Sequence, residues 1–182
     1  MANPKSAYSV STKKEKSDTH IIVVWVDNES GVLARVVGLF SGRGYNIESL
    51  AVAEVDAKKN ISRITIVTTG TPQVIDQIKL QLKKLVPVHK VADFKRNDKS
   101  VIFKEMALFK VVGNSNKIKK AISACKKYNA VILDKTNKSN VIQITALRRD
   151  IDKMAKNLKK LGLVSISRTG AVAMTRGDKI FN

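Results

Sequence analysis

The chain has 182 residues, of which 43% are hydrophobic, and it carries a formal net charge of +19. This hydrophobic content is sufficient for one or two folded cores and excludes a chain that is disordered throughout. The longest apolar runs, such as residues 21–26, have the length of a strand, and a transmembrane helix, which needs ~20 apolar residues, is therefore excluded.

The first predicted elements are a tail, a strand and a helix. Residues 1–19 are rich in Ser, Thr and Lys, and they predict a disordered basic tail. Residues 20–26 are short, β-branched and bounded by polar residues, which predicts a buried strand. From Val32 the apolar residues recur at the period of a helix, and Gly42 and Gly44 end that helix.

The rest of the first half completes a recognisable order of elements. In chain order we predict a hairpin over residues 45–69, a helix that Thr71 and Pro72 open, and a strand over residues 86–94. The order strand, helix, strand, strand, helix, strand is that of a ferredoxin-like α+β sandwich.

The second half repeats this order. We predict strands over residues 101–112, 130–133, 141–147 and 164–168, helices over 115–127 and 150–161, and a last turn and edge segment over 170–180. The fold class is therefore α+β, with two tandem ferredoxin-like βαββαβ sandwiches. Residues 20–95 form the first domain, residues 101–182 form the second, and the polar residues 96–100 link them.

Groups that could carry catalysis are scarce. His20 and His89 are the only histidines, and neither has the spacing of a metal-ligand pair or of a base beside a nucleophile. Cys125 is the only cysteine; it lies on the apolar stripe of a predicted helix, excludes an internal disulfide and favours a reducing compartment. We therefore expect no catalytic residue, no metal site and no cofactor in this chain.

The turn between the first strand and the first helix is the exception. It reads Asn-Glu-Ser-Gly-Val-Leu at residues 28–33. The backbone N–H groups of Gly31, Val32 and Leu33 lack intrahelical partners, and the helix dipole adds positive potential, so a carboxylate could bind there. Asn28 could accept from an ammonium group. The commoner use of such a terminus is a helix cap that binds no ligand, and the local pattern leaves both uses open.

A series of motifs resembles one known family over nearly all of the chain after residue 20. They are Asn-Glu-Ser-Gly-Val-Leu-Ala-Arg at 28–35, Gly-Leu-Phe-Ser at 38–41, Arg-Gly-Tyr-Asn-Ile-Glu-Ser-Leu at 43–50, Ser-Arg at 62–63 with Thr-Ile at 65–66, Gln-Leu-Lys-Lys-Leu-Val at 81–86, Lys-Glu-Met-Ala-Leu-Phe-Lys at 104–110 and Ser-Arg-Thr-Gly-Ala-Val-Ala-Met-Thr-Arg-Gly-Asp-Lys-Ile at 167–180. The chain is similar to the regulatory, small subunits of acetolactate (acetohydroxyacid) synthase, which begin with an ACT domain.

The resemblance implies a non-catalytic regulator of branched-chain amino-acid (valine, leucine and isoleucine) biosynthesis in the cytoplasm. It implies a homodimer of ACT domains that binds valine, or another branched-chain amino acid, between two subunits. It also implies a C-terminal domain that activates the large catalytic subunit, to which thiamine diphosphate, magnesium and FAD belong. The implied effector-binding residues are Asn28, Gly31, Val32 and Leu33 of one subunit and Asn46 and Ile47 of the other.

The charge distribution supports an alternative of another class. Residues 96–182 hold twenty basic and six acidic residues, an excess of +14, whereas residues 21–95 hold ten and seven. A ferredoxin-like nucleic-acid-binding regulator would use such a surplus to contact phosphates. Against this function, residues 96–179 contain only three aromatics, Phe103, Phe109 and Tyr128, and no base-stacking signature.

Overall fold

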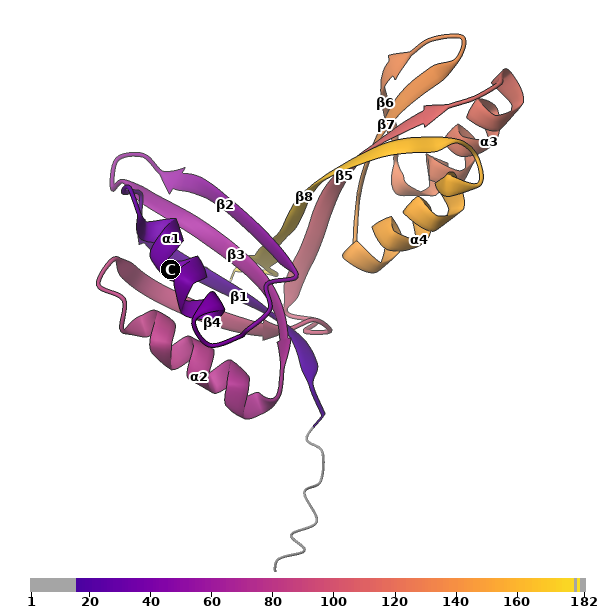
Figure 1. Cartoon of the computed structure of the whole chain (residues 1–182). Helices are drawn as coiled ribbons and strands as arrows, with labels where there is room; N and C mark the ends of the chain where they lie inside the picture. The colour runs from indigo at the N-terminus through magenta and orange to yellow at the C-terminus, as the bar shows by residue number, and fades with distance from the viewer. Residues whose placement is uncertain (1–15, 179, 181–182) are drawn as a thin grey trace, which may run out of the picture.

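The first domain is a four-stranded antiparallel sheet with two helices on one face (Figure 1). The structure is a computed structural model that describes residues 16–178 and residue 180, so most of the predicted tail lies outside the described residues. The sheet order is β2-β3-β1-β4. The elements are β1 (Asp18–Asp27), α1 (Val32–Ser41), β2 (Ser49–Asp56), β3 (Ile61–Gly70), α2 (Pro72–Lys83) and β4 (Val88–Lys95).

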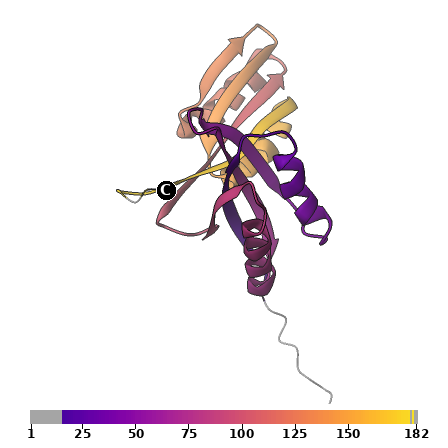
Figure 2. The same ribbon diagram turned by 90° about the vertical axis from the view of Figure 1, so that its left-hand side faces the viewer.

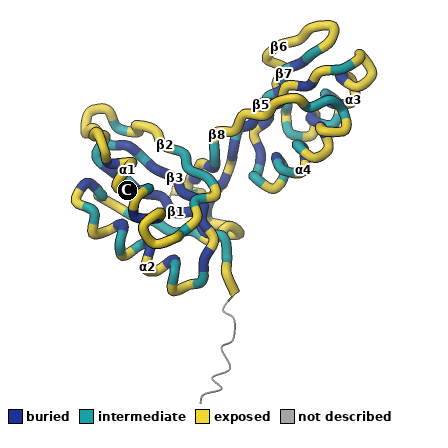
Figure 3. The backbone as a smooth tube through the Cα atoms, in the orientation of Figure 1, coloured by how far each residue is buried: buried dark blue, intermediate teal, exposed yellow. Residues whose placement is uncertain are grey.

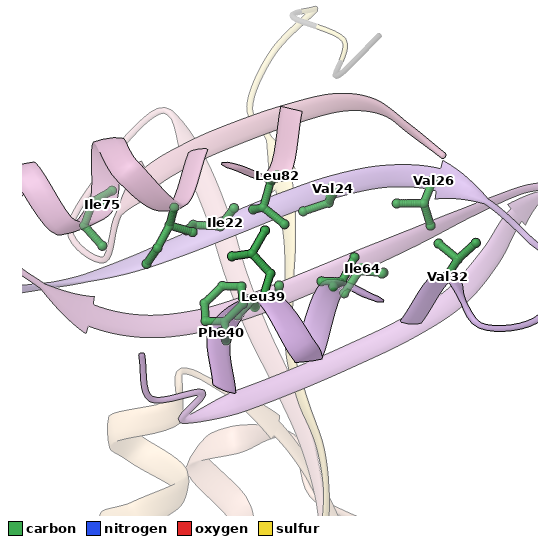
Figure 4. Packing of buried hydrophobic residues seen from close by; sticks show 12 residues of the cluster. Ile22, Val24, Val26, Val32, Leu39, Phe40, Ile64, Ile75 and Leu82 are labelled. Carbon is green, nitrogen blue, oxygen red and sulfur yellow. The ribbon is translucent and has the colours of Figure 1, made fainter. Parts of the chain in front are cut away.

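Both helices form where the sequence supplies an apolar stripe, and α2 also has a side-chain cap at its start. In α2, the Thr71 side chain accepts a hydrogen bond from the Val74 backbone N–H at 3.4 Å, and Pro72 occupies the first turn. In α1, Val36 and Phe40 are fully buried against the sheet. Figure 4 shows Leu39 and Phe40 of α1 among side chains of β1, β3 and α2, and Val36 belongs to the same core. This packing fixes where the turn before α1 sits relative to β3.

The second domain repeats the architecture with the sheet order β6-β7-β5-β8. Its elements are β5 (Val101–Val112), α3 (Ser115–Cys125), the 3₁₀ turn η1 (Lys126–Tyr128), β6 (Val131–Lys135), β7 (Ser139–Ala146), α4 (Arg148–Lys159) and β8 (Leu163–Thr175). Phe109 is fully buried at the centre of its core. The predicted fold class, two tandem ferredoxin-like α+β sandwiches, is confirmed.

The last strand differs from the prediction. We predicted a short strand over residues 164–168 and a separate edge segment, whereas β8 runs unbroken to Thr175 alongside β5. The pairing register shifts between Glu105 and Ala107, and Gly170 adopts a φ of 81° at this place. A β-bulge of this kind lets one strand bend and continue. In the sequence, the glycine at this bend looks like the end of a strand. The Gly-containing turn is therefore a bend inside one strand.

The bend carries β5 and β8 onto the first domain. Figure 2 shows the end of β8 beside the segment that precedes β5, where the Arg176 N–H donates to the Ser100 carbonyl at 2.8 Å. These strand ends bury Val101, Phe103, Ala171 and Ala173 against the helix-free face of the first sheet, at Ile21, Val23 and Val67. In Figure 3 the tube is mostly buried where the two domains meet. The two sandwiches therefore share a third apolar cluster.

Candidate effector site

The turn from β1 into α1 presents unpaired backbone donors. Gly31 caps α1 with a φ of 83°, in the left-handed region that favours glycine, and no side chain caps the helix. The Val32 N–H reaches the Glu29 carbonyl at 3.3 Å. Among the described residues, the N–H groups of Gly31 and Leu33 have no hydrogen-bond partner. These donors and the positive end of the helix dipole can bind a small carboxylate.

Asn28 is held beside these donors by β3. Its side-chain oxygen accepts a hydrogen bond from the Ser62 hydroxyl at 3.0 Å, and its backbone N–H donates to the Asn60 carbonyl at 2.7 Å. An amide oxygen has a second lone pair, so Asn28 can accept from an ammonium group without losing Ser62. The turn therefore offers donors for a carboxylate and an acceptor for an amine, the two charged groups of an amino acid.

Asn46 and Ile47 lie at the other end of the same domain. The Asn46 carbonyl accepts from the Thr68 hydroxyl at 2.7 Å, whereas Asn28 is tied to Ser62, six positions earlier on β3. At ~3.3 Å per residue this separates the two groups by about 20 Å. One chain therefore does not bring together all six predicted effector-binding residues.

Ser62 is a positioning residue that was not among the six predicted effector-binding residues. Its hydroxyl fixes the Asn28 side chain, although it reads in the sequence as an ordinary polar position on an alternating strand. The signal available was its place in the Ser-Arg pair at residues 62–63. The neighbouring Arg63 stacks its guanidinium on the Trp25 ring at 5.2 Å and donates to the Ala173 carbonyl of β8. This part of β3 thus faces both the turn and the second domain.

Two further features bear on the kind of site. Within residues 16–178, no cluster of three or more His, Cys, Asp or Glu side chains is placed to hold a metal ion. No helix in the described part of the chain is long and apolar enough to cross a bilayer. The Asn28 amide and the backbone N–H groups can bind both charged groups of a zwitterion.

Fold and turn together define a class: an ACT-domain protein with a second ferredoxin-like domain joined to it. A family model described as the AHAS small subunit-like ACT domain matches residues 22–90, and one described as the small subunit of acetolactate synthase matches residues 104–177. The chain belongs to the family of acetolactate synthase small subunits, as the resemblance in the sequence had indicated.

Relatives in bacteria match over most of the chain. The acetolactate synthase small subunit of Mycobacterium bovis is 35% identical over 161 residues, which are 88% of this chain and 94% of the relative. The Haemophilus influenzae small subunit is 40% identical, covering 87% of this chain and 96% of its own. The crystal structure of the Thermotoga maritima small subunit matches with a TM-score of 0.80 at 32% identity, covering 88% of this chain and 99% of that one.

Proposed function

We propose that this chain is the regulatory, non-catalytic subunit of an acetolactate synthase and that it binds a branched-chain amino acid, valine in the first place, between two ACT domains. The carrying observation is the turn at residues 28–33, where unpaired amides and a fixed amide oxygen stand together. Family membership supports the proposed partner, because the relatives are named as small subunits of this synthase.

A two-fold pairing of β2 edges would complete the site. β2 is an edge strand of the first sheet, and Val52 and Val55 on it are 45% and 52% exposed. Ser49 pairs with Val67 at one end of β2, and Asp56 pairs with Ile61 at the other. If two β2 edges run antiparallel, the start of one lies beside the end of the other. The residues just before Ser49 in one protomer then face the turn before α1 in its partner.

The completed site would match a branched-chain amino acid in two ways. The turn at residues 28–33 binds the carboxylate and ammonium groups, while Ile47 of the other protomer, half-buried beside its own core, supplies an apolar wall for the side chain. Effector binding then requires the dimer, so the ligand stabilises one arrangement of the two protomers. Regulation follows if that arrangement favours one state of the catalytic subunit, by a coupling of typically ~1 to 3 kcal/mol.

The second domain exposes apolar side chains on both edge strands of its sheet, β6 and β8, and we infer that the large catalytic subunit contacts this domain. Large apolar side chains on β6 and β8 remain more than half exposed: Leu133 at 53%, Val164 at 61%, Val172 at 53% and Met174 at 57%. Exposed apolar groups of this kind mark surfaces that contact other proteins. This domain would dock on, and activate, the subunit that holds thiamine diphosphate, magnesium and FAD.

Valine titration of the reconstituted enzyme tests the effector site. Asn28→Ala removes the proposed ammonium acceptor, and we expect about a tenfold rise in the valine concentration for half inhibition. Gly31→Ala adds a Cβ that meets nothing of the chain within 4 Å, so it projects into the space that the ligand would occupy. We expect this variant to lose valine sensitivity while it still activates the catalytic subunit.

Gly177→Ala is the matched control for Gly31→Ala. Gly177 also has a positive φ, 68°, and open space around its Cβ position, but it lies in the second domain after β8. Equal loss of valine sensitivity in both glycine variants would point to general strain and against the placement of the effector. Unchanged sensitivity in Asn28→Ala would also contradict it.

The nucleic-acid alternative finds little support in the sheets. The helix-free face of the first sheet, which such a protein would present to bases, is covered by the ends of β5 and β8. Phe103 and Phe109, the two aromatics on β5, are 9% and 0% exposed and cannot stack on a base. A salt-dependent gel-shift assay of the full chain should therefore give only weak binding without sequence preference.

A further inference from the structure

A cavity lies where the two domains and their linker meet. It has a volume of about 470 Å³, within the range of small-molecule sites. Ile21 and Val67 of the first sheet and Val101 and Phe103 of β5 contribute apolar lining. The cavity is on the opposite side of the first sheet from α1, because these residues belong to the cluster on the helix-free face. It is therefore separate from the turn at residues 28–33.

Basic side chains from four parts of the chain line this cavity. They are Arg96 and Lys99 of the linker, Lys104 of β5, Arg148 and Arg149 of α4, and Arg176 after β8. The acidic lining residues are fewer: Glu48, Asp98 and Glu105. Six positive groups against three negative ones leave an excess of three positive charges around a single cavity.

The acidic groups are already engaged, whereas most of the basic ones are not. Glu105 is held by Arg168 at 2.7 Å, and Glu48 lies 3.8 Å from Arg148. Asp98 accepts from the Ser100 N–H at 2.8 Å.

Five of the six basic side chains that line the cavity form no ion pair with the described part of the chain. Within residues 16–178, these lining side chains take part in no ion pair: Arg96, Lys99, Lys104, Arg149 and Arg176. The first turn of α4 also points its positive dipole end at the cavity, since Leu147, Arg148 and Arg149 line it. Such a concentration of unpaired cations around an apolar floor is costly unless an anion neutralises it.

We propose that this cavity is a second effector site, for a small organic anion that carries at least two negative charges on an apolar body. The charged groups would be phosphate or carboxylate oxygens, which arginine binds with paired N–H donors. The apolar body would rest on Ile21, Val67 and Phe103. Because the lining comes from both domains and the linker, a bound anion would hold the two sandwiches in one relative arrangement.

The test uses 1-naphthyl phosphate as the probe and isothermal titration of the full-length chain at low salt. Two comparison ligands separate the contributions of the two parts of the probe. The first, 1-naphthol, has the apolar body without the charge, and the second, inorganic phosphate, has the charge without the apolar body. We expect saturable binding of 1-naphthyl phosphate, with both part-ligands at least about tenfold weaker. Equal binding of inorganic phosphate, equal binding of 1-naphthol, or no binding of the probe at millimolar concentration would each overturn the proposal.

Three single-charge variants locate the probe. Arg149→Gln and Arg176→Gln each remove an exposed cation of the cavity and should weaken binding about tenfold without changing the unfolding temperature of the free protein. Lys120→Gln removes an exposed cation from α3, outside the cavity, and should leave affinity unchanged. Equal weakening by Lys120→Gln would show diffuse attraction to a basic surface and refute a site.

Asn28→Ala separates this inference from the amino-acid site. The Asn28→Ala variant should bind 1-naphthyl phosphate with unchanged affinity, because Asn28 is not part of the cavity lining. A loss of probe binding in Asn28→Ala would mean that the anion occupies the turn before α1, and the second site would be withdrawn. Failure of valine to bind would leave the anion site standing.

Discussion

Arg168 links a buried carboxylate to a surface one, and removing it should destabilise the second domain by about 3 kcal/mol. Its guanidinium binds both oxygens of Glu105, at 2.7 and 2.8 Å, and donates to Asp152 at 2.7 Å. The bonds to Glu105 raise the pKa of Arg168, with a smaller contribution from Asp152. Glu105 is only 3% exposed, so the Arg168→Met variant leaves a charge in the protein without a partner.

The size of the expected stability loss follows from how deeply the Arg168–Glu105 ion pair is buried. Breaking a fully buried pair costs ~3 to 5 kcal/mol, and the Arg168 side chain is 28% exposed, which places the loss at the lower end. Asp152→Asn removes only the outer contact, whose carboxylate is 45% exposed, and should cost less than about 1 kcal/mol. Glu105→Leu combined with Arg168→Met removes both buried charges and should recover most of the loss.

Urea denaturation followed by circular dichroism measures all three variants, with the slope of the free energy against urea checked for changes in the unfolded state. We expect Arg168→Met to be the least stable and Asp152→Asn to resemble the unsubstituted chain. If Arg168→Met lost less than about 1 kcal/mol, or if Asp152→Asn lost as much as Arg168→Met, the reasoning from burial would be wrong.

Three further predictions concern the backbone, a thiol and a helix cap. Gly162→Ala places a Cβ 2.1 Å from the Val112 carbonyl and should cost at least about 3 kcal/mol in thermal unfolding, unlike Gly177→Ala, whose Cβ meets nothing. Burial raises the pKa of the Cys125 thiol to about 11, so the folded state keeps a proton that the unfolded chain releases. Stability should be complete below pH ~9 and fall by about 1.4 kcal/mol per pH unit towards pH ~11, an effect that Cys125→Ala abolishes in urea titrations. Asn114→Ala removes the cap of α3 and should cost about 1 kcal/mol in the same assay; no change would show that the cap does not stabilise α3.

Interactions between residues that are close in the sequence explain which parts of the fold were predictable. Thr71 and Pro72 predicted the start of α2, and the apolar stripe from Val32 to Phe40 predicted α1. Both signals are readable in the sequence because capping and helical periodicity act between residues a few positions apart. β8 was predicted in two pieces because Gly170 looks like a turn, and only its pairing with β5 makes it a bulge within one strand.

The sequence by itself determined the order of the elements, the duplication of the sandwich and the chemical character of the turn at residues 28–33. Only the tertiary structure decided that Asn28 and Asn46 are hydrogen-bonded to residues near opposite ends of β3. It also decided that Arg96, Arg149 and Arg176 line one cavity. The reason is physical: periodicity and capping are read within one element, whereas the cavity depends on how β5 and β8 cross from one sheet to the other. That crossing is fixed by burial of Phe103 and Ala171 against Ile21, far away in the chain.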